Sequence, residues 1–272
     1  MNLTTLTREQ KLELLGAGAL ILVLLGLIGW YMATNRAPEP YVPVPETVPT
    51  VPPPPEPGMI IEHAQYYEIE ATYPAETPLL SSADAEANAA AIGVMKTFVE
   101  DTVQDFKRQG DFDSLTDEDL RIMGYDQGRK QTLAIEYEEK AGADTVSYVY
   151  TIYIDTFGAH PNGFYRTFTF DTESGTELAI RNLFQPKSAY LARLSEISRF
   201  ELAKVLGPDA NLEYLNQGTE PKDLNFENFA IESDALVLIF PPYQVGPYAL
   251  GTQIVTIPLS QLKDILKPEY LP

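Results

Sequence analysis

Two neighbouring stretches decide the fold: KQTLAIEYEEK at residues 130–140 and TVSYVYTIYIDTF at residues 145–157. In the second stretch every other residue is apolar, and this period of two is typical of a strand. The residues on that apolar face are Val146, Tyr148, Tyr150, Ile152 and Ile154. Turn-forming residues 141–144 separate the two stretches, so the sequence predicts a pair of adjacent strands.

Upstream of this pair, the sequence predicts a strand region and then a helix. Residues 60–72 have the alternation and the Ile and Tyr content of strand structure. Ser81 followed by Asp84 resembles a capping box, and an apolar face then continues to Gly110. That face consists of Ile92, Met95, Val99, Val103 and Phe106.

Downstream, residues 163–171 predict a strand that turns at 172–175 into 177–180, as in a hairpin. A helix is expected over 187–206, ending at Gly207 and Pro208. Its expected apolar face comprises Tyr190, Leu194, Ile197, Leu202 and Val205. Strands are then expected at 228–232, 235–240 and 252–258, and a short helix at 260–266. Runs of strands with a helix in each half predict an α+β fold with a mostly antiparallel sheet.

The N-terminal region predicts a membrane anchor. The run from Leu14 to Ala33 carries no charge and is about 20 residues long, enough for a helix to cross a bilayer. Arg8 and Lys11 precede it, which favours a cytoplasmic N-terminus. A cleaved signal peptide is the alternative, but such peptides have a shorter apolar core and a small-residue cleavage site. We therefore expect a single-pass cell-membrane protein whose C-terminal domain is extracytoplasmic.

Residues 35–58, NRAPEPYVPVPETVPTVPPPPEPG, predict a stalk. Proline fixes φ and lacks a backbone donor, so this composition favours an extended polyproline II spacer rather than helix or sheet. The expected organisation is a cytoplasmic tail at 1–13, a transmembrane helix at 14–34, the stalk at 35–58, an N-terminal part of the ectodomain at 59–157 and a C-terminal domain at 158–272.

The charge and the cysteine content exclude several classes of function. The chain has 19 Lys and Arg against 39 Asp and Glu, a formal charge of -20, which repels nucleic acid and favours basic partners. It has no cysteine and two histidines, so thiol nucleophiles, disulfides and thiolate zinc sites are excluded. We expect no cofactor and no metal.

Three stretches of the second half resemble one family. They are GAHPN at 158–162, the segment from Phe170 through Gly175 to Phe184, and FPPYQVGPYALG at 240–251. In type, order and spacing they resemble the domain of unknown function shared by RsiV-type anti-sigma factors and PdaC-type peptidoglycan deacetylases. The chain differs from the family pattern at Phe157, where glycine is frequent, at Gln244, where an acidic residue is frequent, and at Asn182, where Asp is usual.

The resemblance implies a module outside the cytoplasmic membrane, which in RsiV binds lysozyme, a basic enzyme. An anti-sigma role would need a cytoplasmic domain, yet only residues 1–13 precede the apolar run. A PdaC-type deacetylase needs a further domain with an Asp and two His on a metal, but the sequence has only His63 and His160. Both roles are therefore disfavoured, and we expect no enzyme activity.

The candidate binding residues are Tyr243, Tyr248, His160 and Asn162. Tyrosines in the proline-rich segment 241–248 are favoured as anchors at interfaces, and they stack on sugars. The segment could instead be a structural turn, and His160 could be bonded to backbone in a tight turn. The second histidine, His63, lies in the first strand pattern and is expected to be structural.

Two further patterns carry no site. The acidic cluster between Asp111 and Asp119 fails the EF-hand pattern, because Thr116 and Ile122 stand where Gly and Glu are required. Thr116 with Asp119 instead predicts a helix cap. Asp and Glu are abundant, yet no spacing selects a catalytic carboxylate pair.

The sequence thus predicts a membrane-anchored, extracytoplasmic binding module of the cell envelope. The expected partner is a basic hydrolase such as lysozyme or a peptidoglycan glycan. The alternative is a cell-wall modifying enzyme whose site is not recognisable from sequence. A third possibility is a structural subunit of a larger envelope complex. Ligand, oligomeric state and organism stay open.

Overall fold

A computed structural model describes residues 58–77, 85–142, 144–208 and 211–271. The predicted transmembrane helix, the stalk apart from Gly58, and the predicted cap at Ser81 and Asp84 lie outside these residues. No helix within the described ranges is long and apolar enough to cross a membrane.

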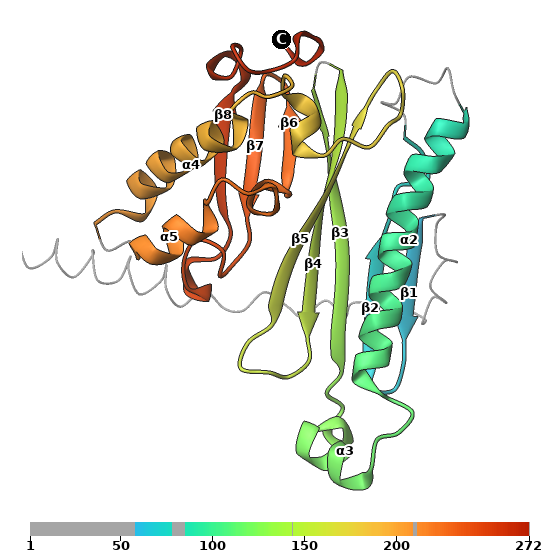
Figure 1. The fold of residues 1–272 in the computed structure, drawn as a ribbon. Coiled ribbons are helices and arrows are strands. Elements are labelled where there is room, and N and C mark those ends of the chain that lie inside the picture. Colours follow the sequence, from blue (N-terminus) through green and yellow to red (C-terminus); the bar gives the residue numbers. More distant parts are fainter. Residues whose placement is uncertain (1–57, 78–84, 143, 209–210, 272) are drawn as a thin grey trace, which may run out of the picture. The chain divides into compact units, whose positions relative to one another are not determined.

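The first sheet has five strands in the order β1-β2-β3-β4-β5 (Figure 1). They are β1 Met59–His63, β2 Tyr67–Thr72, β3 Gln131–Ala141, β4 Thr145–Asp155 and β5 Asn162–Asp171. All neighbours pair antiparallel except β2 and β3, which run parallel. A parallel pair needs a long crossover, and here that connection contains helix α2, Ala85–Gly110. The predicted boundary at 157/158 falls between β4 and β5, which are neighbours in this sheet.

Helix α2 covers one face of this sheet (Figure 1). Met95, Val99 and Val103 are at most 2% exposed and pack against the predicted apolar face of β4. The ring of Phe98 meets those of Tyr150 and Phe168 edge-on, at centroid distances of 5.5 and 5.6 Å. Each such side chain contributes about 1.5–3 kcal/mol by leaving water, so the predicted period of two in β4 positions this core.

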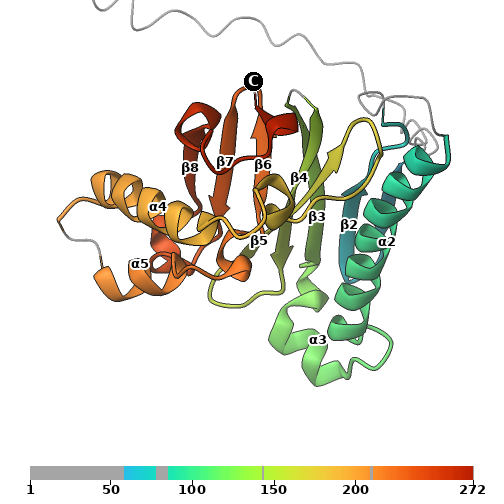
Figure 2. The same cartoon turned by 45° about the horizontal axis from the view of Figure 1, so that its top comes forward.

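The second sheet has three antiparallel strands in the order β6-β7-β8. They are β6 Phe229–Glu232, β7 Ala235–Phe240 and β8 Gln253–Pro258. Helix α4, Tyr190–Leu206, lies beside β8, and α5, Leu212–Gly218, follows it in the chain (Figure 2). Leu194 and Leu202 of α4 share one buried core with Leu238, Phe240 and Ile257. The predicted α+β class is therefore confirmed.

The two sheets meet along β6 (Figure 2), at what we call the hydroxyl seam: Ser147, Thr167 and Thr169. As an edge strand, β6 has backbone groups that its own sheet leaves unpaired. The Phe229 N–H donates to Thr167 Oγ1 at 3.0 Å, and the Ile231 N–H donates to Ser147 Oγ at 3.1 Å. Thr169 Oγ1 donates to the Phe229 carbonyl at 3.4 Å and lies 2.9 Å from Ser147 Oγ. The buried hydroxyls of β4 and β5 therefore satisfy the edge of β6.

Two local predictions were wrong. Val205 does not face the core but is 73% exposed, and its neighbour Leu206 packs there instead. The predicted helix at 260–266 is a 3-10 turn, Leu259–Gln261, followed by further turns. The predicted hairpin after β5 is present but short: it contains one antiparallel bridge, between Phe170 and Glu177, because the chain then enters a 3-10 helix, Ile180–Leu183.

The cap at Thr116 is confirmed. Its side chain accepts the Asp119 N–H, and the Asp119 carboxylate accepts the Thr116 N–H at the start of α3, Asp117–Met123. The Thr116 hydroxyl also donates to the Asp119 carboxylate at 2.6 Å, and this bond, together with the one from the Thr116 N–H, holds the pKa of Asp119 below its usual value. The acidic run at 111–119 therefore begins a helix. Helix α5 was not predicted.

Candidate functional site

Three of the four predicted site residues meet in space. His160 lies in the β4–β5 loop, and Tyr243 and Tyr248 lie in the β7–β8 loop. We call these three residues the aromatic cluster. Asn162, the fourth, is the first residue of β5, and among the described residues no hydrogen bond joins its side chain to the other three.

The aromatic cluster is held by stacking and by one shared carbonyl group. The rings of His160 and Tyr248 stack with centroids 3.7 Å apart and 14° between planes. The Pro161 carbonyl accepts the Tyr248 hydroxyl at 2.7 Å and lies 2.8 Å from His160 Nδ1. A carbonyl can only accept, so Nδ1 carries a proton, and in the neutral ring Nε2 accepts the Tyr243 hydroxyl at 3.0 Å. The predicted backbone bond of His160 thus exists together with contacts to both tyrosines.

Tyr243 occupies a backbone conformation that favours glycine. The Gln244 N–H donates to the Pro241 carbonyl at 3.1 Å, which closes a turn with Pro242 and Tyr243 at its centre. The φ of Tyr243 is 73°, and a left-handed residue after proline is typical of a type II turn with glycine at that position. Such a conformation costs about 1–3 kcal/mol in a residue with a side chain. The Tyr243 side chain is nevertheless 52% exposed.

The β7–β8 loop is fixed from behind by Gln244. Its amide nitrogen donates to the carbonyls of Gly218 and Asn225, each at 2.9 Å. A Cβ atom on Gly218 would collide with the Gln244 carbonyl oxygen, so this close approach requires glycine. A carboxylate could not donate these two hydrogen bonds, which explains why Gln rather than an acidic residue fits here.

Phe157 is the other loop residue at which the chain differs from the family pattern. It adopts a φ of 65°, and glycine is frequent at this position because it takes up such a left-handed backbone without strain. The Arg129 guanidinium lies 3.8 Å from the centre of the Phe157 ring, and the ring contacts Tyr125 at a centroid distance of 5.7 Å. Stacking between these groups stabilises the β4–β5 loop next to the aromatic cluster.

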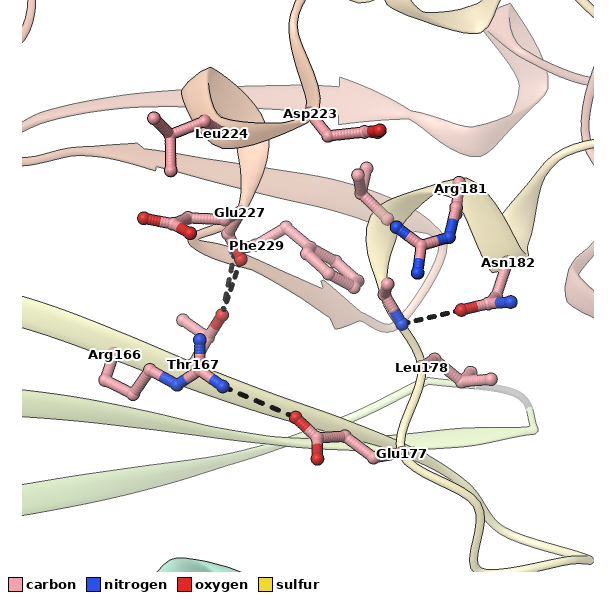
Figure 3. A pocket seen from close by; sticks show the side chains of 12 residues that line it. Arg166, Thr167, Glu177, Leu178, Arg181, Asn182, Asp223, Leu224, Glu227 and Phe229 are labelled. Atoms are coloured by element: carbon pink, nitrogen blue, oxygen red, sulfur yellow. Dashed lines mark hydrogen bonds and ion pairs between the residues drawn. The ribbon is translucent and has the colours of Figure 1, made fainter. Parts of the chain in front are cut away.

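A cleft of about 470 Å³ lies between β5, residues 177–182 and the 3-10 helix Asp223–Phe226 (Figure 3). We call it the arginine cleft. Its charged residues are Arg166, Glu177, Arg181, Asp223 and Glu227. Arg166 pairs with Glu177 at 3.5 Å, and the Tyr190 hydroxyl donates to Asp223 at 2.6 Å.

Burial, together with that hydrogen bond, raises the pKa of Tyr190 to about 12, so the hydroxyl stays a donor at neutral pH. Sequence reasoning missed this cleft. Its charges come from separate elements, and the only signal was the arginine in the strand pattern of β5.

Elsewhere, His63 of β1 lies 3.9 Å from Glu68 with about half of its side chain exposed. Within the part of the chain that the structure describes, no three His, Cys, Asp or Glu residues are grouped as metal ligands. The chemistry that the aromatic cluster offers is ring stacking and hydrogen bonding through one tyrosine hydroxyl.

Comparison with known proteins confirms the resemblance found in the sequence. Residues 181–260 match the family described as "Protein of unknown function (DUF3298)". The chain is 39% identical over 127 residues to the peptidoglycan-N-acetylmuramic acid deacetylase PdaC of Bacillus subtilis, covering 47% of this chain and 27% of PdaC. It is 28% identical over 122 residues to the immunogenic protein MPT64 of Mycobacterium tuberculosis, covering 45% of this chain and 52% of MPT64.

An esterase of Mycobacterium tuberculosis is 28% identical over 121 residues, covering 44% of this chain and 52% of the esterase. The match thus spans from about a quarter to half of these relatives. A DUF3298 family structure from Bacteroides fragilis has a TM-score of 0.52 at 17% identity, over 78% of this chain and 92% of that one, which shows a shared fold.

Proposed function

We propose that the protein is a non-catalytic binding module of the cell envelope and that the aromatic cluster contacts its ligand. One observation carries the proposal: Tyr243 keeps an unfavourable backbone conformation while its ring stays half exposed. A residue that only closed the turn would be more stable as glycine. Strain of this kind is expected where a side chain serves binding.

The setting supports an envelope role. The predicted anchor at Leu14–Ala33 and the proline-rich stalk would hold the domain outside the cytoplasmic membrane. The relative PdaC is named for action on peptidoglycan. Its matched region is a minor part of its length, in keeping with a shared binding module.

Two ligands fit different features. The geometry favours a glycan of the cell wall, because exposed tyrosine rings stack on sugar faces and Tyr243 offers a hydroxyl. The charge of -20 favours a basic hydrolase such as lysozyme. Salt separates them, since the Debye length falls from about 10 Å at 0.1 M to about 3 Å at 1 M and weakens only the charge-steered partner.

The test is calorimetry of the full chain in lipid nanodiscs, titrated with lysozyme and with peptide-free glycan strands at both salt concentrations. We expect heat with at least one ligand, and at least tenfold weaker binding for Tyr243→Gly and Tyr248→Ala. Ile61→Ala, at the opposite edge of the first sheet, is the control because Ile61 is also exposed. No heat with either ligand, or equal binding by all variants, would overturn the proposal.

A cell-wall modifying enzyme is the second candidate, because two relatives are named as a deacetylase and an esterase. Incubation of purified peptidoglycan with the full chain distinguishes the two functions. Release of acetate or sugar fragments, lost in Tyr243→Gly, would replace the binding proposal by the enzyme.

A further inference from the structure

Strand β5 is an edge of the first sheet, and the described part of the chain covers this edge only in part. The Leu178 N–H donates to the Thr169 carbonyl at 2.7 Å, and the Asp171 N–H donates to the Thr176 carbonyl at 3.0 Å. Residues 176–178 therefore cover the end of β5, pairing with it antiparallel through these two bonds and the bridge between Phe170 and Glu177. This cover stops where the chain turns away into the 3-10 helix Ile180–Leu183.

The remainder of the edge offers free backbone groups. Alternate residues of a strand direct their N–H and C=O to the same side, and Thr169 and Asp171 direct theirs away from β4. Gly163, Tyr165 and Thr167 have the same parity and pair with β4 without a bulge. Among the described residues, no backbone hydrogen bond reaches these three from the outer side.

The arginine cleft lies against this free edge, since Arg166 and Thr167 line it (Figure 3). Arg166 and Glu177 neutralise each other, and Asp223 accepts the Tyr190 hydroxyl. Arg181 and Glu227 remain, and the structure gives neither side chain an ion pair or hydrogen bond within the described ranges. They lie on different sides of the cleft in Figure 3.

Apolar surface completes the cleft. Leu178 and Phe229 are buried in its wall, whereas Leu224 is 71% exposed and available to a further apolar side chain. A ligand that matches all of these groups must pair with a strand edge, carry one acidic and one basic group, and present an apolar side chain.

We infer that the β5 edge and the arginine cleft bind an extended peptide segment of a partner protein. The segment continues the position of Thr176–Leu178 as an added strand, with a carboxylate on Arg181 and a cation facing Glu227. Strand addition provides affinity through the backbone, and the flanking charges select the sequence. The residues differ from the aromatic cluster, so this inference does not depend on the proposed function.

A second copy of this chain is the less favoured occupant. Each copy carries a formal charge of -20, so edge-to-edge pairing brings two like-charged molecules together. A short peptide with balanced charge does not meet this repulsion.

The probe is a panel of labelled heptapeptides of Thr and Val in which one Glu and one Lys occupy every combination of positions. Fluorescence anisotropy with the full chain in nanodiscs should find members with micromolar Kd. Gly163→Pro removes one outward N–H and adds a ring where a Cβ meets no atom within 4 Å. This change and Arg181→Glu should each weaken binding at least tenfold, whereas Arg108→Glu on α2 should not.

Circular dichroism and urea unfolding check that Gly163→Pro is folded, and if it is not, Arg181→Glu alone decides. The inference is overturned if every peptide of the panel has a Kd above about 1 mM. It is also overturned if binding is unchanged in Arg181→Glu. A dimer in sedimentation that Gly163→Pro dissociates would assign the edge to a second copy instead.

Discussion

The hydroxyl seam and the aromatic cluster are both built from polar side chains, but they use them in opposite ways. In the seam, Thr167 and Thr169 are at most 5% exposed, and their hydroxyls bond the backbone N–H and carbonyl of Phe229 in β6. In the cluster, Tyr243 is 52% exposed, and among the residues that the structure describes its hydroxyl bonds only the His160 ring.

Two turns of the second sheet show the same contrast. Ser233 and Tyr243 both adopt a left-handed backbone, at φ 54° and 73°. The Ser233 N–H donates to the Ala141 carbonyl at 2.7 Å, so this conformation joins the two sheets. No comparable backbone bond from Tyr243 is present in the described chain. Strain that secures packing therefore differs from strain that presents a ring to solvent.

The largest effect on folding is expected in the seam. Thr167→Val removes an acceptor from the Phe229 N–H and a donor from the Glu227 carbonyl. Each buried group left unpaired costs about 1–3 kcal/mol, so the free energy of unfolding should fall by about 2–4 kcal/mol. Urea unfolding of the full chain measures this.

Thr151→Val is the matched control, because Thr151 lies exposed on β4, and it should change stability by less than about 0.5 kcal/mol. Equal effects of the two substitutions would show that the seam does not hold the sheets together. Binding of the glycan or of lysozyme at the aromatic cluster should be unchanged in folded Thr167→Val, because the cluster does not include Thr167.

An intermediate effect on stability is expected from a change at Gln244, which fixes the β7–β8 loop. Gln244→Glu replaces two donated hydrogen bonds by a carboxylate that faces the carbonyls of Gly218 and Asn225. Unfolding at neutral pH should become easier by about 1–3 kcal/mol. The lost stability should partly return as the pH is lowered, because a protonated carboxyl group regains one hydrogen-bond donor. The loss in the free energy of unfolding should therefore grow with rising pH. An unchanged or more stable variant across this pH range would contradict the role assigned to Gln244.

Limited proteolysis of the full chain tests the stalk and the strand pairing together. Early cuts should fall in the proline-rich stalk, residues 35–58, because its composition provides no regular backbone hydrogen bonds. Mass spectrometry of the fragments identifies the sites. Early cuts between residues 157 and 183 would contradict the pairing of β4 with β5 and the placement of both functional regions.

Much of the fold could be predicted because its signals are local. The alternation of Val146 to Ile154 and the period of Met95, Val99 and Val103 each follow from one element. The parallel pairing of β2 with β3 could not be predicted, since it depends on α2 crossing between distant segments. The prediction that Val205 faces the core was wrong for a related reason: an apolar stripe on a helix does not reveal where the surface that it packs against ends.

The site was predictable only where one segment carried it. Tyr243 and Tyr248 stand in a single proline-rich motif, whereas their contact with His160 joins loops about 80 residues apart, an arrangement that no local pattern encodes. In the arginine cleft, Arg181 lies in one 3-10 helix and Glu227 directly follows another, more than 40 residues along the chain. In the sequence, the Ser and Thr residues of the seam look like ordinary strand residues. Only the position of β6 in the structure shows that their hydroxyls bond its backbone.

The smallest effect on stability tests the central claim most directly. Tyr243→Gly relieves a left-handed backbone, so unfolding should be unchanged or more costly by up to about 1 kcal/mol. The same variant should bind the ligand at least tenfold more weakly, because the exposed ring is lost. Urea unfolding and calorimetry on one preparation give both values. Binding that stays intact while stability falls would show that Tyr243 serves the turn alone and would contradict the account.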